Sequence, residues 1–97
     1  MKIDLGKFGT TLTSRQLGKE AYAAFRPTLQ TVNDEEMIEV DFSGVITFSP
    51  SWGDEFLTML LNDFPRRVVL RNTENPSVQA TLKMLEKINN MRFKIGE

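Results

Sequence analysis

The stretch MIEVDFSGVITFSPSWGDEFLTMLL, residues 37–61, determines how the rest of the chain is arranged. From Ile38 to Phe42 apolar and polar residues alternate, which is the period-two pattern of a strand. After a turn at Gly44 the chain continues through the largely apolar residues 45–48, and from Ser51 onward the apolar spacing becomes that of a helix. The stretch therefore predicts a strand, a short bend and a helix, with polar side chains gathered between the bend and the helix.

A helix is predicted on either side of this stretch. The first begins at Thr13, where Thr-Ser-Arg-Gln forms a capping-box pattern, and Pro27 should kink it or end it near Arg26. Its predicted apolar face consists of Leu17, Ala21, Ala24, Phe25, Leu29 and Val32. The other helix begins at Asn75-Pro76, a cap followed by proline at the first helical position, as at Ser49-Pro50.

Strands are predicted in the remaining segments. We expect an edge strand in residues 2–8, a strand buried on both faces of a parallel sheet at residues 68–70, and a final strand in residues 91–95. The order strand, helix, strand, helix, strand, helix, strand is typical of an α/β fold. We therefore expect one domain over residues 1–97, with a roughly four-stranded, mixed or mostly parallel sheet and about three helices.

Composition excludes several classes of function. With 97 residues and a net charge of −1, the chain is too small for two cores and too weakly charged for nonspecific nucleic-acid binding. It contains neither Cys nor His, which removes the usual zinc ligands and His-based or thiol catalysis. No apolar run approaches the length of a membrane span, and no signal peptide is recognisable. We expect a cytoplasmic protein that binds no cofactor and is not an enzyme.

Polar residues should gather at one edge of the sheet. Parallel connections bring helix starts to the edge that holds the carboxyl ends of the strands, so residues 9–15, 49–55 and 72–75 are expected to meet. The candidate residues for binding a partner or ligand are Thr13, Ser14, Arg15, Ser49, Ser51, Trp52, Asp54, Glu55 and Asn72.

Most of these residues also have structural explanations. Ser49 and Ser51 are suited to cap a helix, and carboxylates at Asp54 and Glu55 favour the positive end of the helix dipole. Arg15 is expected to pair with these carboxylates. Trp52 is a candidate partner anchor, although its spacing with the next aromatic residue favours the core.

The chain resembles the STAS domains, the fold of anti-sigma-factor antagonists and of cytoplasmic modules of transporters. Its nearest likeness is to the STAS-like branch of unknown function, carried by Asp41-Phe42-Ser43-Gly44-Val45 and Asp54-Glu55. In the antagonists a serine after this strand is phosphorylated by a partner ATPase-type kinase. An ungapped alignment puts Pro50 at that position, between Ser49 and Ser51, so these two serines are the phosphoacceptor candidates.

The resemblance implies a non-catalytic, regulatory protein-interaction module, with a partner such as a histidine-kinase-like ATPase and a phosphorylation switch before the second helix. Two alternatives stay open. One is a domain that senses a nucleotide or another anion over the clustered helix starts. The other, less favoured, is a carboxylate-based enzyme that uses Asp54, Glu55 and Arg15.

Overall fold

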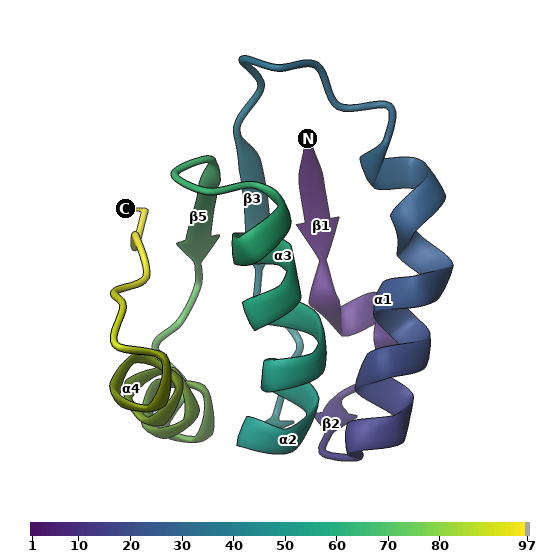
Figure 1. Cartoon of the computed structure of the whole chain (residues 1–97). Coiled ribbons are helices and arrows are strands. Elements are labelled where there is room, and N and C mark those ends of the chain that lie inside the picture. Colours follow the sequence, from purple (N-terminus) through teal and green to yellow (C-terminus); the bar gives the residue numbers. More distant parts are fainter. Residues whose placement is uncertain (97) are drawn as a thin grey trace.

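The central strand of the protein is β3, which is formed by the alternating residues near the start of the stretch 37–61. In the computed structural model, which describes residues 1–96, β3 pairs with β1 on one side and β5 on the other, and both pairings are parallel (Figure 1). A second sheet contains only β2 and β4, also parallel. The strands are β1 (Lys2–Asp4), β2 (Thr11–Leu12), β3 (Ile38–Asp41), β4 (Thr47–Phe48) and β5 (Val68–Arg71). A parallel α/β fold is therefore confirmed, and β1 is an edge strand as predicted.

Three helical regions follow the strands in turn. The first is α1 (Arg15–Leu29), and the last is α4 (Pro76–Asn89). Between them, one continuous helical run is made of α2 (Pro50–Gly53), the π-helical turn η2 (Asp54–Thr58) and α3 (Met59–Asp63), while a 3₁₀ turn, η1 (Leu5–Phe8), follows β1. The strands all point toward the end of the molecule where the helices begin, and both chain ends lie toward the opposite end (Figure 1).

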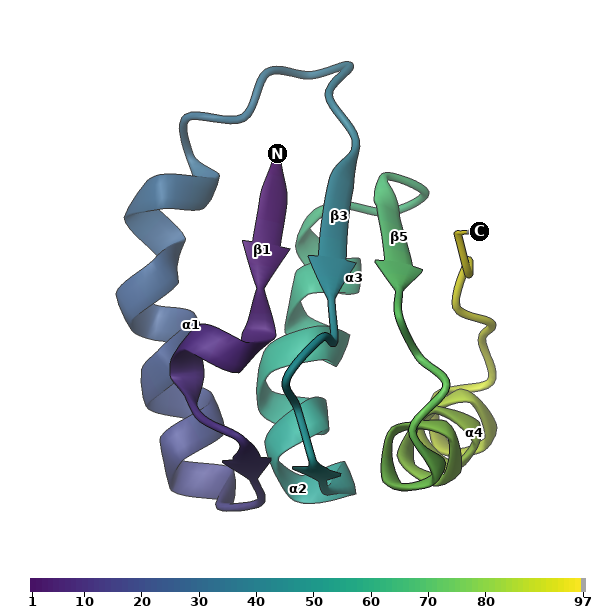
Figure 2. The same cartoon turned by 180° about the vertical axis from the view of Figure 1, so that it is seen from behind.

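The helices α1 and α2–α3 cover one face of the three-stranded sheet, and no helix crosses the other face (Figure 2). On the covered face Ile3, Val40 and Leu70 stand opposite one another and are at most 1% exposed. On the open face ion pairs join neighbouring strands, Lys2 with Asp41 and Arg71 with Glu39, each at 3.2 Å. These pairs explain how a parallel sheet, which is usually covered on both faces, can leave one face to solvent.

The two ends of the chain differ from the sequence prediction. The N-terminal strand stops at Asp4, because the Asp4 side chain accepts a hydrogen bond from Gly6 N and caps a 3₁₀ turn. The expected final strand, residues 91–95, is reduced to a single bridge between Ile95 and Leu70. The reason lies in Phe93, whose amide donates to the Glu86 carboxylate of α4 (2.8 Å) instead of to a neighbouring strand.

Helix α1 is rotated relative to the predicted apolar face. Ser14, not Thr13, is the N-cap, since its hydroxyl accepts from Leu17 N at 3.1 Å. The buried residues are Gly18, Tyr22 and Leu29, whereas Leu17 is 59% exposed and Ala24 is exposed. Helix α1 also continues through Pro27 to Leu29, because Pro27 lies in the last turn and Gln30 N still reaches Arg26 O (3.2 Å).

Candidate interaction surface at the helix starts

The bend after β3 is fixed by the buried carboxylate of Asp41. Its Oδ1 accepts hydrogen bonds from Ser43 N at 2.9 Å and from Asn72 Nδ2 at 2.8 Å, while Oδ2 lies 3.2 Å from Lys2 Nζ. The hydrogen bond from Asn72 is the main reason why the pKa of Asp41 is held well below its usual range. Asp41 therefore orients the bend, which passes through Gly44 at a φ of +84°.

Strands β2 and β4 then bring the starts of α1 and α2 together. Ile46 N donates to Thr10 O at 2.8 Å, and Ser49 N donates to Leu12 O at 2.9 Å. The Ser49 hydroxyl has two partners: it donates to Thr13 O at 2.8 Å and accepts from Trp52 N at 3.3 Å. Ser49 is thus the N-cap of α2 and a direct link to the residue before the α1 cap.

Helix α4 holds β4 from the other side. The Asn75 side chain caps α4 by accepting from Ser77 N and Val78 N, and its Nδ2 donates to Ile46 O at 3.0 Å. Ser77 Oγ accepts from Phe48 N at 3.0 Å. All three helix starts therefore converge on residues 45–49, as the parallel connections predicted.

A cluster of charged side chains joins the start of α1 to the start of the continuous helical run α2–η2–α3, called the central helix below. Arg15 Nη1 lies 2.6 Å from Glu55 Oε2 and 3.3 Å from Asp54 Oδ2, and the hydrogen bond to Glu55 is the leading cause of a raised Arg15 pKa. The side chains of Arg15, Asp54 and Glu55 are 55%, 38% and 25% exposed, so the cluster is accessible from solvent. The predicted pairing of Arg15 with these carboxylates is confirmed. We call the following residues the helix-start surface: Thr13, Ser14, Arg15, Ser49, Ser51, Asp54 and Glu55.

The two phosphoacceptor candidates differ in their surroundings. Ser49 Oγ is engaged on both sides, as donor and as acceptor. Ser51, in the first turn of α2, is partly exposed, and its hydroxyl has no hydrogen-bond partner among residues 1–96. The structure thus assigns the capping role to Ser49 alone, and the alternative helix start at Ser51 is wrong.

Two of the candidate binding residues do not belong to this surface. Trp52 is only 2% exposed and stacks on Phe56 with ring centroids 5.0 Å apart and an interplanar angle of 17°. It is a core residue, because the helix directs it toward Phe8 of η1 and Phe48 of β4, and it presents nothing to a partner in this conformation. Asn72 is bound to Asp41 at the end of the sheet, and within residues 1–96 no hydrogen bond or ion pair joins its side chain to the helix-start surface.

Sequence reasoning missed the π-helical turn η2, which carries both Asp54 and Glu55 at its start. π turns widen a helix locally and occur frequently at functional sites. The apolar spacing gave no signal of it, since buried residues such as Phe56, Leu57 and Leu60 also fit an ordinary α-helix.

Within residues 1–96 no group of three or more His, Cys, Asp or Glu side chains is placed to hold a metal ion. Among those residues there is also no helix with the length and apolar character needed to cross a membrane.

These features define a small parallel α/β domain whose half-exposed polar side chains gather where its helices begin. Residues 22–78 match the STAS-like domain of unknown function (DUF4325), and since the match covers more than half of the chain, the protein belongs to this family. The matched part includes Asp41, Ser49, Ser51 and the acidic pair, but not Arg15. Neither a curated protein nor a solved structure was found to match the chain.

Proposed function

We propose that the chain is a non-catalytic regulatory module that binds a protein partner through the helix-start surface. The observation that carries this proposal is the cluster of Arg15, Asp54 and Glu55, which is charged, half-exposed and built on two helix starts that backbone hydrogen bonds hold together. Surface ion pairs contribute little to stability, so the cluster can exchange its partners at low cost. Such a cluster is suited to recognise a partner of complementary charge.

Ser51 is the phosphoacceptor that the surroundings favour. Phosphorylation of Ser49 would remove the N-cap of α2 and its link to Thr13, whereas the Ser51 hydroxyl has no partner to lose among the described residues. A phosphate on Ser51 would add about −1.5 to −2 charges three and four residues before Asp54 and Glu55. It would compete with the two carboxylates for Arg15, since guanidinium groups bind phosphate strongly. In this way one modification changes the charge that a partner meets.

The proposed partner is a regulator with kinase activity, such as a histidine-kinase-like ATPase, in keeping with the resemblance to anti-sigma-factor antagonists. The nucleotide then belongs to the partner, and this chain needs no cofactor of its own.

Binding of an anion at the helix starts has less support. In the first turn of α1, α2 and α4 one amide, that of Leu17, Trp52 and Ser77 respectively, already donates to the side chain of the cap residue and is not available to an anion. The carboxylates of Asp54 and Glu55 add negative charge beside the start of α2, which disfavours an anion there. The carboxylate-based enzyme is disfavoured as well, because Arg15 binds both carboxylates and leaves neither placed as a free base.

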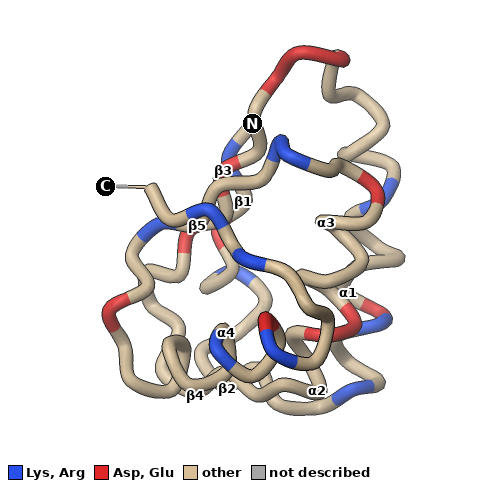
Figure 3. Tube along the Cα trace, turned by 60° about the vertical axis from the view of Figure 1, so that its left-hand side comes forward, with Lys and Arg blue, Asp and Glu red and all other residues tan. Residues whose placement is uncertain are grey.

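The test uses the full chain as bait in lysate of its source organism, with and without ATP, followed by intact-mass measurement of the bait. We expect one regulator to be captured, and a phosphate-sized mass increase that maps to Ser51 and disappears in Ser51→Ala. The double variant D54A/E55A should lose the regulator. The matched control is D34A/E35A, which removes an adjacent acidic pair from the exposed loop at the opposite end of the molecule (Figure 3).

Two results would contradict the proposal. Retention of the regulator by D54A/E55A would exclude the helix-start surface as the binding site. Equal loss with D34A/E35A would show that capture depends on overall negative charge rather than on this surface.

A further inference from the structure

A second polar site lies at the other end of the central helix. A hollow of about 310 Å³ opens between the end of α3 and the segment that follows α4. Two arginines, Arg66 and Arg92, contribute to its wall together with the amide side chains of Asn62 and Asn89. Apolar side chains, among them Leu61 and Phe93, complete the lining. Its size is at the lower end of the range for small-molecule sites, and its mixed lining is typical of them.

The hollow is positively charged although the whole chain is slightly acidic. Its lining contains no carboxylate, and within residues 1–96 neither Arg66 nor Arg92 has an ion pair or hydrogen bond that would neutralise it. Arg66 also adopts a φ of +66°, a left-handed conformation that is costly for a large side chain. Two free guanidinium groups at one concave site favour a negatively charged ligand.

The side of the hollow formed by the π-helical turn contains an unsatisfied hydroxyl. Thr58, the last residue of η2, lines the hollow, and its Oγ1 is the one buried side-chain polar atom without a hydrogen-bond partner in the described part of the chain. Buried hydroxyl groups are normally paired, so an unpaired one calls for an explanation. After a rotation about its Cα–Cβ bond, Thr58 can donate a hydrogen bond to a group bound in the hollow.

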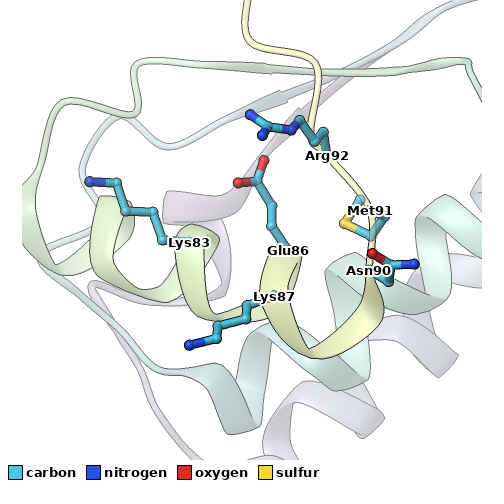
Figure 4. A pocket seen from close by; sticks show the side chains of 6 residues that line it. All are labelled: Lys83, Glu86, Lys87, Asn90, Met91 and Arg92. Carbon is cyan, nitrogen blue, oxygen red and sulfur yellow. The ribbon is translucent and has the colours of Figure 1, made fainter.

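A second hollow of about 480 Å³ adjoins the first. Its residues show how the segment that carries Arg92 is held in place. The two hollows share Met91 and Arg92, and the larger one is also lined by Lys83, Glu86 and Lys87 of α4 (Figure 4). Arg92 and Glu86 extend into the same space above the helix, and Glu86 fixes the following segment by accepting from Phe93 N at 2.8 Å. The basic residues that line the smaller hollow itself are therefore Arg66 and Arg92, while Lys83, Lys87 and the carboxylate of Glu86 line the larger one.

We propose that the hollow between α3 and the segment after α4 binds a small organic anion, a carboxylate or a phosphate ester with an apolar part. Arg66 and Arg92 bind the charged group, Asn62 and Asn89 orient it, and the apolar part lies against Leu61 and Phe93. This site is distinct from the helix starts, where the sequence suggested that an anion could bind.

The test measures chemical-shift changes of backbone amides when the purified full chain is titrated with four probes. Phenyl phosphate and benzoate carry both a charge and an apolar part, inorganic phosphate lacks the apolar part, and benzyl alcohol lacks the charge. We expect saturable shifts at Asn62, Arg66 and Arg92 with one or both of the first two probes. The tighter of these two identifies the ligand as a phosphate ester or a carboxylate.

Variants then assign the binding to particular residues. Arg66→Gln and, separately, Arg92→Gln should each weaken binding about tenfold, the factor that corresponds to one charge-assisted hydrogen bond. The matched control is Lys83→Gln, which removes a positive charge that lines the larger hollow but not the smaller one and should leave the affinity nearly unchanged.

Three outcomes would overturn the proposal: no saturable shift with any charged probe, equal binding of benzyl alcohol or inorganic phosphate, or shifts that map to residues 49–55 instead. The proposal does not depend on the partner-binding function, because purified protein and probes alone decide it. Loss of partner capture by D54A/E55A leaves it unaffected.

Discussion

Asn72 donates a hydrogen bond to the buried carboxylate of Asp41 at 2.8 Å, and this bond joins the carboxyl end of β3 to the residue after β5. Asn72 adopts a φ of +57°, which turns its amide back toward the central strand. Since Asn accepts the left-handed conformation more readily than most residues, this pairing sets both the end of β5 and the direction of the chain after β3.

We predict that Asp41→Asn lowers the free energy of unfolding at pH 7 by about 2 kcal/mol, the contribution of hydrogen bonds to a charged group. The depressed pKa of Asp41 means that its stabilisation is complete above about pH 4, the ordinary range of an aspartate, and declines as the pH falls below it. Urea unfolding between pH 7 and pH 3 should therefore show a smaller acid-induced loss in Asp41→Asn than in the unmodified chain. Asp34→Asn, in an exposed loop, is the control, and an equal acid response of Asp41→Asn and the unmodified chain would contradict the assignment.

Ser49 and Ser51 form a matched pair for a second prediction. Ser49→Ala removes the N-cap of α2 and should cost about 1 kcal/mol of unfolding free energy. Ser51→Ala removes a hydroxyl without a partner in the described chain and should change stability by less than about 0.5 kcal/mol. Urea midpoints of the two variants decide the matter, and similar losses in both would show that Ser51 has a structural role after all.

The close contact of α1 with the start of the central helix supports a third prediction. A Cβ atom on Gly18 would lie 2.7 Å from Trp52 O and 3.0 Å from Trp52 Cα, both backbone atoms that cannot move independently. Gly18→Ala should therefore destabilise the protein by about 1–3 kcal/mol, although alanine is the better helix former by about 1 kcal/mol. The control is Ala23→Gly on the exposed face of α1, which should cost only the propensity difference. A gain in melting temperature with Gly18→Ala would show that the two helices can separate at little cost.

A fourth prediction concerns the unsatisfied hydroxyl in the π-helical turn. Thr58→Val replaces a buried unpaired hydroxyl with a methyl group of similar size and should raise the unfolding free energy by about 1 kcal/mol. Thr58→Ser keeps the hydroxyl and removes the methyl group, so it should not be stabilising. Thermal unfolding of the two variants tests this, and a destabilised Thr58→Val would mean that Thr58 Oγ1 is hydrogen-bonded in solution.

The sequence was most informative where a local pattern carries its own chemistry. The cap-plus-proline pairs Ser49-Pro50 and Asn75-Pro76 predicted the starts of α2 and α4 correctly, because a cap bonds to amides only two or three residues away. The pairing of Arg15 with Asp54 and Glu55 was also predictable, since parallel connections bring helix starts to one edge. Alternation in β3 and the apolar run in β5 were enough to predict the parallel sheet.

Features that depend on distant contacts could not be predicted. The strands β2 and β4 are only two residues long and exist because residues 10–12 and 46–48 happen to lie side by side. The rotation of α1 follows from the tight approach of Gly18 to Trp52, which no periodicity reveals. The basic hollow combines residues from α3, the turn at Arg66 and the segment after α4, so its charge is visible only after folding.

The position of the chain ends determines how the protein can be oriented on a solid support. The N-terminus and the segment of residues 91–96 both lie away from the helix-start surface, so a tag at either end would hold that surface outward, toward a binding partner (Figure 1). The two ends are not equivalent, however, because the amino group of Met1 lies 2.8 Å from the Glu36 carboxylate and donates to Met37 O at 3.0 Å. A tag fused before Met1 converts this charged amine into a neutral amide and removes the ion pair. Immobilisation through the C-terminus keeps the contacts of the N-terminus.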